Sequence, residues 1–140
     1  MPNILVPFDG SDSALRAVRH AARLAKLIAG TQIELLHVLD PVLVGEHTVI
    51  STQDIRRIQD EEAARVLQPA REVLDAEGIP YMAHHRCGAP AGEIAQQVYE
   101  SKCDAVVMGT RGLGPIASIM IGSVATRVIH LVDVPVTLIK

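Results

Sequence analysis

Residues 3–13 of the chain read NILVPFDGSDS, and they hold its clearest structural signal. The apolar run Ile4–Val6 is continuous instead of alternating, which is typical of a strand buried on both faces of a parallel sheet. The Asp, Gly and Ser residues that follow favour tight turns and helix N-caps. Apolar side chains then recur every three or four positions from Leu15 to Ala29, and Gly30 marks a helix end. The stretch therefore predicts a strand that leads through a polar turn into an amphipathic helix.

The same alternation of strand and helix continues to the end of the chain. We expect further strands at residues 33–39, 81–87, 105–108 and 135–139, with helices between them. In the second helix, Pro69 removes a backbone donor and clashes with the preceding turn, which predicts a kink or break near Arg65. The pattern predicts an α/β fold with a doubly wound, Rossmann-like, five-stranded parallel sheet in the order 3-2-1-4-5 and four helices.

Composition indicates a single folded domain over residues 1–140. Of the 140 residues, 49% are hydrophobic and 21% are charged, a balance that excludes intrinsic disorder. The net charge of −3 and an aromatic content of 2% argue against binding of nucleic acids, which relies on clustered positive charge and stacking rings. The longest uncharged stretch, residues 112–126, is too short for a membrane span and contains glycine and proline, so we expect no membrane association.

The two cysteines and the start of the chain indicate the compartment. Cys87 and Cys103 form no CxxC motif, and the chain enters its first strand without the features of a secretory signal. We therefore expect reduced, packed thiols in a cytoplasmic protein.

Two loops at one edge of the predicted sheet are candidates for ligand binding. In open α/β sheets, ligands bind beyond the carboxyl ends of strands where the strand order reverses, here between the first and fourth strands. Residues 7–11 follow the first strand, and the Gly-rich segment 109–123 follows the fourth. Glycine allows backbone N–H groups to approach an anion closely, and the helix that Ser123 is expected to cap adds further donors. The segment predicts an anion site; the alternative is a loop that needs glycine only for its turns.

The glycine spacing adds a more specific signal. Residues 109–123 match the pattern G-x2-G-x9-G-[S/T] at every fixed position. This pattern resembles the phosphate-binding signature of the universal stress protein family. Residues 4–11, the pair His37-Val38 and residues 134–139 are similar to the first, second and last strands of that family, so the resemblance covers the whole chain.

The nucleotide-binding branch of this family implies ATP as the cofactor and leaves open whether Mg²⁺ accompanies it. By this resemblance, Asp9 would bond the ribose hydroxyls and the backbone of Val38 would meet the adenine edge. The phosphates would be held by Gly109, Gly112, Gly122 and Ser123. The remaining residues of the implied site are Pro7, Phe8, Met108, Arg111 and Val124. For Arg111, contact with the phosphates and exposure to solvent are both open.

The final strand predicts how the chain associates. Residues Val134 to Ile139 would lie at the edge of the sheet and carry no charge before Lys140. An edge strand leaves a row of unpaired N–H and C=O groups, which a second copy related by a two-fold axis would satisfy. Similar members of the family dimerise in this way, so we expect a homodimer through Val134–Ile139. The alternative is that a helix or loop covers the strand.

The resemblance implies a regulatory role in the stress response, exerted through nucleotide binding and dimerisation. Two alternatives stay open: an adenylating or slow ATP-hydrolysing enzyme on the same fold, and an interaction module that binds no nucleotide. Residues 109–126 contain no Asp, Glu or His, so this loop offers neither a general base nor a carboxylate for a metal. We therefore expect at most slow hydrolysis and assign no catalytic residue.

Two adjacent histidines, His84 and His85, raise the question of a metal site. Successive side chains of a strand point to opposite faces of the sheet, so these two imidazoles cannot easily hold one ion. His37 is expected to pack within the second strand. The sequence therefore predicts no metal site.

Overall fold

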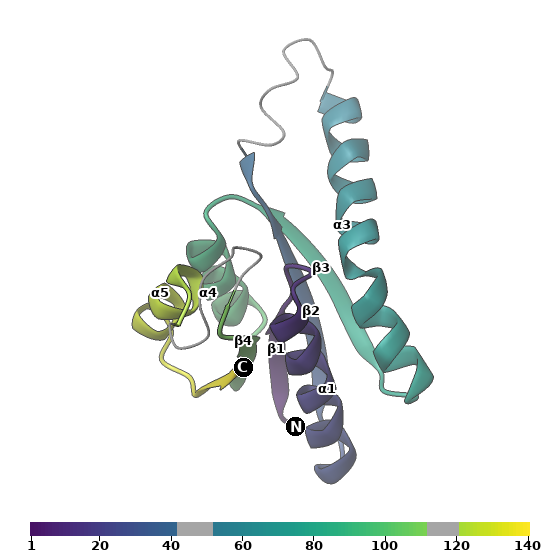
Figure 1. Cartoon of the computed structure of the whole chain (residues 1–140), viewed down its shortest axis with the longest axis vertical. Coiled ribbons are helices and arrows are strands. Elements are labelled where there is room, and N and C mark those ends of the chain that lie inside the picture. The colour runs from purple at the N-terminus through teal and green to yellow at the C-terminus, as the bar shows by residue number, and fades with distance from the viewer. Residues whose placement is uncertain (42–51, 112–120) are drawn as a thin grey trace.

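The computed structural model describes residues 1–41, 52–111 and 121–140, and Figure 1 shows how its elements are arranged. In chain order these are β1 (Asn3–Pro7), α1 (Asp12–Leu27), β2 (Gln32–Leu39), α3 (Thr52–Ala76), β3 (Tyr81–Cys87), α4 (Pro90–Glu100), β4 (Ala105–Gly109), α5 (Ser123–Leu131) and β5 (Val136–Ile139). Strands and helices alternate along the chain as the sequence predicts.

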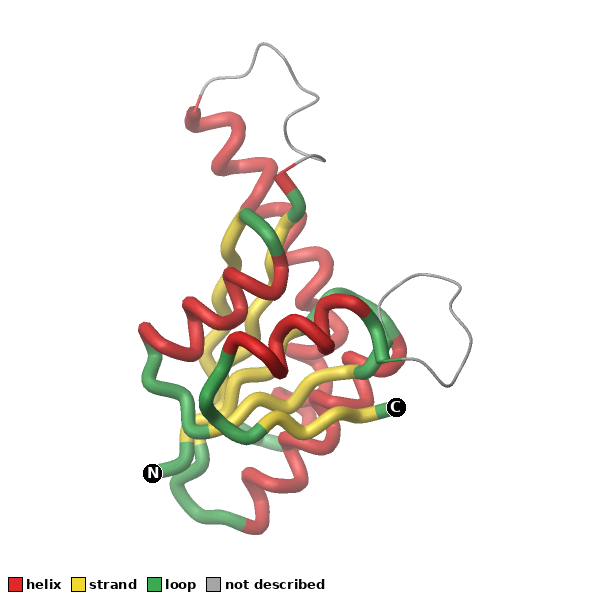
Figure 2. Tube along the Cα trace, turned by 90° about the vertical axis from the view of Figure 1, so that its left-hand side faces the viewer, coloured by secondary structure: helices red, strands yellow, loops and turns green. Residues whose placement is uncertain are grey.

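The five strands form one parallel sheet in the order β3-β2-β1-β4-β5, which confirms the predicted topology. The strand order reverses between β1 and β4 at the centre of the sheet. Helices cover both faces: α1 and α3 pack on one, and α4 and α5 pack on the other (Figures 1 and 2). The result is a doubly wound, Rossmann-like α/β fold with four helices in the described part of the chain. None of these helices is long and apolar enough to cross a membrane.

Successive residues of β1 are buried on opposite faces of the sheet, which explains the continuous apolar run in the sequence. Ile4 and Val6 join the core formed with α1 and α3, whereas Leu5 joins the core formed with α4 and α5. Their exposed fractions are 4%, 0% and 0% respectively. Because β1 is packed on both faces, its carboxyl end is a rigid support for residues 7–11.

α3 is one continuous helix, so the predicted break near Arg65 is wrong. Its buried side chains lie on both sides of the proline along the helix and pack toward the sheet: Ala63, Leu67, Ala70 and Leu74. Pro69 and Arg65 are both exposed, so the carbonyl that loses its helical partner to the proline lies on the side where water can hydrogen-bond to it. Packing of the apolar face therefore maintains the helix across Pro69.

The two cysteines differ in environment, and neither forms a disulfide. Cys87, at the end of β3, is exposed, so the prediction that both thiols are packed is wrong for this residue. Cys103 is buried, and burial raises the pKa of its thiol to about 12, with further contributions from the charges of Glu34 and Asp104. Cys103 therefore stays protonated and packs as a small apolar residue.

Gly109, the last residue of β4, passes directly beside the first turn of α1. A Cβ atom at this position would lie 2.8 Å from the backbone nitrogen of Ala14 and closer still to the hydroxyl of Ser13. Cβ atoms do not approach backbone this closely, so only glycine lets the two elements pack in this way. The contact places the segment after β4 next to the turn after β1.

Gly109→Ala should therefore destabilise the fold by about 1–3 kcal/mol, because the added methyl group overpacks a contact with rigid backbone. Gly92→Ala is the matched control, since a Cβ at this position in α4 would meet no atom within 4 Å. Alanine at residue 92 should be neutral or stabilising by up to about 1 kcal/mol. Urea unfolding followed by circular dichroism measures both free energies. Equal values for the two variants would contradict this account of Gly109.

Candidate functional site

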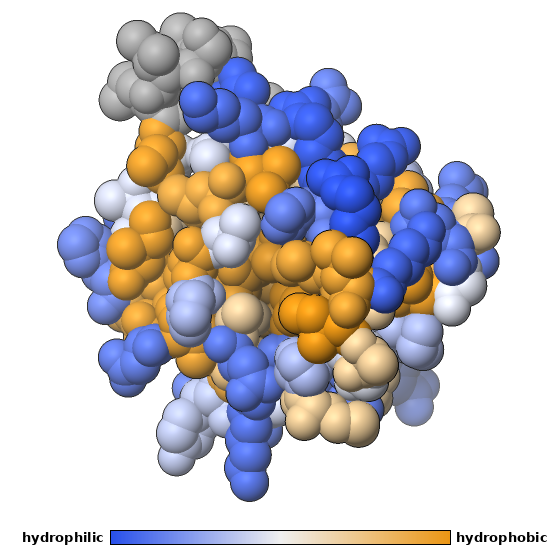
Figure 3. Space-filling model, turned by 90° about the horizontal axis from the view of Figure 1, so that it is seen from below, coloured by the Kyte–Doolittle hydropathy of each residue, from blue (hydrophilic) through white to orange (hydrophobic). Residues whose placement is uncertain are grey.

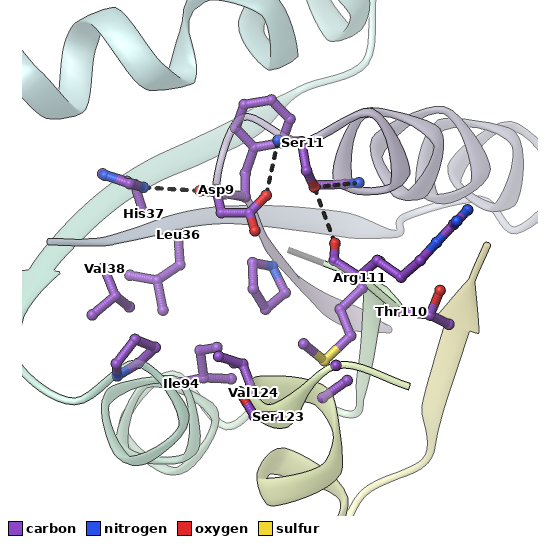
Figure 4. Close-up of a pocket in the computed structure, with 18 residues that line it drawn as sticks. Asp9, Ser11, Leu36, His37, Val38, Ile94, Thr110, Arg111, Ser123 and Val124 are labelled. Carbon is purple, nitrogen blue, oxygen red and sulfur yellow. Dashed lines mark hydrogen bonds between the residues drawn. The ribbon is translucent and has the colours of Figure 1, made fainter. Parts of the chain in front are cut away.

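A cavity of about 320 Å³ lies between the carboxyl ends of β1, β2 and β4 and the starts of α4 and α5 (Figure 4). Apart from one glycine, all residues of the predicted site line it: Pro7, Phe8, Asp9, Val38, Met108, Gly109, Arg111, Gly122, Ser123 and Val124. The remaining one, Gly112, lies outside the described residues. The two loops that the sequence assigns to one crevice therefore meet at one cavity.

Ser11 and Thr110, from the two predicted loops, also line the cavity. The sequence does not predict its other lining residues: Ala14, Leu36, His37, Pro90, Ile94 and Ala125. Most of them lie within a few positions of a predicted site residue, so they could have been predicted from their closeness to it in the sequence. Pro90 and Ile94 carry no such signal, because they belong to α4. This helix reaches the cavity only through its packing on the sheet.

An ion-pair network fixes α4 in that position. Arg86 of β3 donates from Nε to Glu93 at 2.6 Å and from Nη1 to Glu100 at 2.8 Å. The hydrogen bonds that Arg86 donates to Glu100 and Glu93 raise its pKa, so the guanidinium stays charged. These bonds attach α4 along its length to the edge of the sheet, and its first turns stay at the cavity.

His37 also lines the cavity, whereas the sequence predicts only a packing role for it. Its Nδ1 lies 2.9 Å from the backbone carbonyl oxygen of Phe8. A carbonyl oxygen can only accept, so Nδ1 carries the hydrogen in this contact. The bond ties the end of β2 to the turn that contains Asp9.

The walls of the cavity are largely aliphatic. Figure 4 shows Leu36, Val38 and Ile94 together on one side of it. Phe8 is only 3% exposed and belongs to the core under α1 and α3. A flat ring bound here would therefore lie between aliphatic side chains and would not depend on aromatic stacking.

The end of β2 presents a backbone donor and acceptor to the cavity. Hydrogen bonding between β1 and β2 ends at the bond from Phe8 N–H to Leu36 O, which is 2.8 Å long. On the opposite side of β2, Leu39 O accepts from Gly88 N–H at 3.0 Å. Backbone groups of successive strand residues point in opposite directions. The N–H and C=O of Val38 therefore point to the side of β1, beyond its last hydrogen bond, where the cavity lies.

Asp9 sits in a tight turn that orients its carboxylate. Its Oδ1 accepts a hydrogen bond from Ser11 N–H at 2.9 Å. Gly10 adopts a φ of +89°, a conformation that glycine takes without strain. In the described part of the chain, no residue donates a hydrogen bond to Oδ2, and Asp9 is exposed. The second carboxylate oxygen is therefore an acceptor available to a ligand.

The start of α5 faces the cavity with N–H groups that no described residue accepts from. The N-cap residue is Gly122, so the predicted capping role of Ser123 is wrong; Ser123 is already helical, and no side chain in the described part of the chain caps this helix. The first internal bond runs from Thr126 N–H to Gly122 O at 3.0 Å. Gly122 N–H in turn donates to Thr110 O at 2.6 Å, which fixes the helix start beside the end of β4. Free N–H groups at the positive end of a helix dipole favour an anion at this point.

Arg111 is fixed at the cavity by its backbone. Figure 4 shows its side chain extending away from Asp9 and Val38. Its carbonyl oxygen accepts a hydrogen bond from Ser13 Oγ at 2.8 Å. The position of the residue in the site is therefore set by α1 and not by its guanidinium.

The adjacent histidines of β3 point to opposite faces of the sheet, as the sequence predicts. His84 Nε2 lies 3.1 Å from Glu34 of β2, and His85 Nε2 lies 3.0 Å from Asp60 of α3. Across residues 1–41, 52–111 and 121–140, no group of three or more His, Cys, Asp or Glu side chains is arranged to hold a metal ion.

Comparisons with known proteins agree with this architecture. The model of the universal stress protein family matches residues 1–140. A universal stress protein of Methanocaldococcus jannaschii, MJ0531, is 33% identical over 138 residues, which cover 98% of this chain and 81% of that protein. The solved structure of MJ0577 from the same organism superposes with a TM-score of 0.82 at 26% identity, covering 99% of this chain and 95% of that one. The universal stress protein of Archaeoglobus fulgidus in complex with dAMP gives a TM-score of 0.71 at 30% identity, covering 100% of this chain and 98% of that one. The chain therefore belongs to the universal stress protein family.

Proposed function

We propose that this protein binds ATP in the cavity and acts as a nucleotide-dependent regulator of the stress response in the cytoplasm. The observation that carries the proposal is the set of polar groups around one apolar cavity. The backbone pair of Val38, the free carboxylate oxygen of Asp9 and the uncapped start of α5 all face it. A nucleotide offers a matching set of groups, namely a base edge, ribose hydroxyls and phosphates.

A relative supports an adenine nucleotide as the ligand. The Archaeoglobus fulgidus protein, which is 30% identical to this chain, was solved in complex with dAMP. The cavity volume of 320 Å³ falls within the range of about 300–1,000 Å³ that is typical of small-molecule sites.

The backbone of Val38 favours adenine over guanine. Adenine presents an acceptor at N1 beside a donor at the 6-amino group, which complements one N–H and one C=O. Guanine presents an acceptor at O6 and a hydrogen on N1, which is the reverse arrangement.

The other parts of the nucleotide have partners of their own. Asp9 would accept from the ribose hydroxyls, and the phosphates would be held by Gly109, Gly112, Gly122 and Ser123. Asp9 is the single carboxylate among the described lining residues, so Mg²⁺ would be held chiefly by the phosphates.

Calorimetry on the wild-type protein should show binding of ATP and at least about tenfold weaker binding of GTP. ATP at a hundred times its Kd should raise the free energy of unfolding by about 2.7 kcal/mol.

Gly122→Val should abolish binding, because a branched side chain would occupy the space that the phosphates approach. The backbone at residue 122, with φ −63° and ψ 161°, is one that valine can adopt, so the variant should fold.

Gly92→Ala serves as the binding control and should keep the wild-type affinity, because Gly92 does not line the cavity and its added Cβ would meet no atom within 4 Å. A folded Gly122→Val protein with unchanged affinity for ATP would disprove the assigned phosphate position. Equal affinity for ATP and GTP would disprove the role of Val38.

Turnover of ATP should be slower than about 1 s⁻¹, the low end of ordinary enzyme rates. The reason is chemical: residues 109–126 contain no Asp, Glu or His that could act as a general base near the phosphates. Release of inorganic phosphate from purified protein and excess Mg-ATP measures the rate. A faster rate would favour the alternative of an ATP-hydrolysing enzyme.

We also propose that the protein forms a homodimer through β5. This strand pairs with β4 on one side and is the last strand of the sheet. The carbonyls of Pro135 and Ile139 accept from Val106 and Thr110 on the β4 side, each at 2.9 Å. Because backbone directions alternate, residues 136 and 138 turn their N–H and C=O groups to the outer edge. A second copy could pair with this edge.

Exposed apolar side chains in and next to the helix that precedes β5 support the same proposal. Figure 3 shows that apolar side chains are gathered over much of one face, seen from below. In and next to α5, exposed apolar residues include Ile121, Ile129 and Leu131, with exposed fractions of 48%, 43% and 55%. Dimerisation would remove such surface from water.

Light scattering should give the wild-type protein twice the mass of the 15.0 kDa chain at micromolar concentration. Thr137 is exposed on β5, so Thr137→Glu leaves the bonds to β4 in place and brings two like charges together across a two-fold axis. This variant should be monomeric, whereas the neutral control Thr137→Val should stay dimeric. A wild-type monomer, or a Thr137→Glu dimer, would exclude pairing through β5.

A further inference from the structure

Two serine hydroxyls from the start of α1 hold one backbone carbonyl of the segment that leaves β4. Ser13 Oγ donates to the carbonyl oxygen of Arg111 at 2.8 Å, and Ser11 Oγ lies 3.3 Å from the same oxygen. Both serines are buried, with exposed fractions of 3% and 7%. Ser11 is also the N-cap of α1 and lines the cavity, whereas Ser13 does not line it.

The carbonyl of the preceding residue, Thr110, also accepts a hydrogen bond. Thr110 O accepts from Gly122 N–H at 2.6 Å, so it is directed to the start of α5. Two consecutive carbonyls at the phosphate end of the cavity are therefore each held by the start of a different helix. This arrangement matters for an anion, because a carbonyl oxygen carries partial negative charge and repels phosphate when it faces the site.

Gly109 makes room for the hydrogen bond between Ser13 and Arg111. A Cβ on Gly109 would collide with the hydroxyl of Ser13, so this bond requires glycine at the end of β4. Ser13 and Arg111 are 98 positions apart in the sequence, and the bond between them closes the gap between the two loops of the site.

We propose that Ser13 is a positioning residue for phosphate binding: it holds the Arg111 carbonyl away from the anion and orients the backbone that receives the phosphates. This inference rests on the proposed binding of nucleotide. The proposed role concerns only the phosphate end of the site, because among the described residues Ser13 forms no hydrogen bond with Val38 or Asp9.

The test is calorimetric titration of adenosine, AMP and ATP into wild-type protein and Ser13→Ala. The affinity for adenosine should be unchanged, whereas the affinities for AMP and ATP should fall by about tenfold, because the released Arg111 carbonyl would repel the charged phosphates. Ser13→Cys keeps the side-chain volume with only a weak donor and should show the same selective loss. If Ser13→Ala does not fold, Ser13→Cys tests the same role of the Ser13 hydroxyl.

Thr31→Val is the matched control. Thr31 is 6% exposed and donates from Oγ1 to the carbonyl of Ile28 at 2.7 Å, at the opposite end of α1 from the site. This variant loses the same kind of buried hydroxyl bond and should leave all three affinities unchanged.

The outcomes separate the two proposals. If the Ser13 variants bind all three ligands as the wild type does, or lose adenosine and AMP by the same factor, Ser13 has only a structural role and the inference fails while the proposed function stands. If the wild-type protein binds none of the three ligands, the proposed function fails and the inference fails with it.

Discussion

The site depends on the close packing of β4 against the first turn of α1 at Gly109. β1 and β4 are neighbours in the sheet, and each is followed by a loop that contributes to the cavity. Without a side chain at residue 109, the backbone of β4 lies beside Ala14, and the hydroxyl of Ser13 reaches the carbonyl of Arg111. A larger residue would separate the two loops, and the cavity between them would lose its shape. One missing Cβ atom therefore sets the geometry of groups that lie far apart in the chain.

Backbone groups contribute to the polar surface of the cavity at both of its ends. The N–H and C=O of Val38 and the N–H groups at the start of α5 have directions set by strand and helix geometry. Such groups do not titrate, so their capacity to hold a base edge or an anion does not depend on the ionisation of a side chain. The arrangement fits the proposed binding of a nucleotide, which requires no side chain to transfer a proton.

Two predictions from the sequence fail for the same reason: each weighs one residue without the tertiary contacts around it. Pro69 is a strong local signal for a break, but burial of Leu67 and Ala70 on either side of it keeps α3 continuous. Ser123 is a good capping residue, yet the extended backbone of Gly122 begins the helix one position earlier, and no described side chain caps its N–H groups. In the second case the departure from local preference occurs at the candidate site, where unpaired donors have a use.

The sequence by itself determined the fold class, the order of the elements, the strand order and the two segments that form the site. These features follow from hydrophobic periodicity and from the position of Gly and Asp after strands, which depend on residues close together in the chain. Only the tertiary structure decided that the imidazole of His37 and the side chain of Ile94 also line the cavity. It also decided that Ser13 holds Arg111. The physical reason is that these contacts join segments up to 98 positions apart, and their geometry exists only once helices and strands have packed.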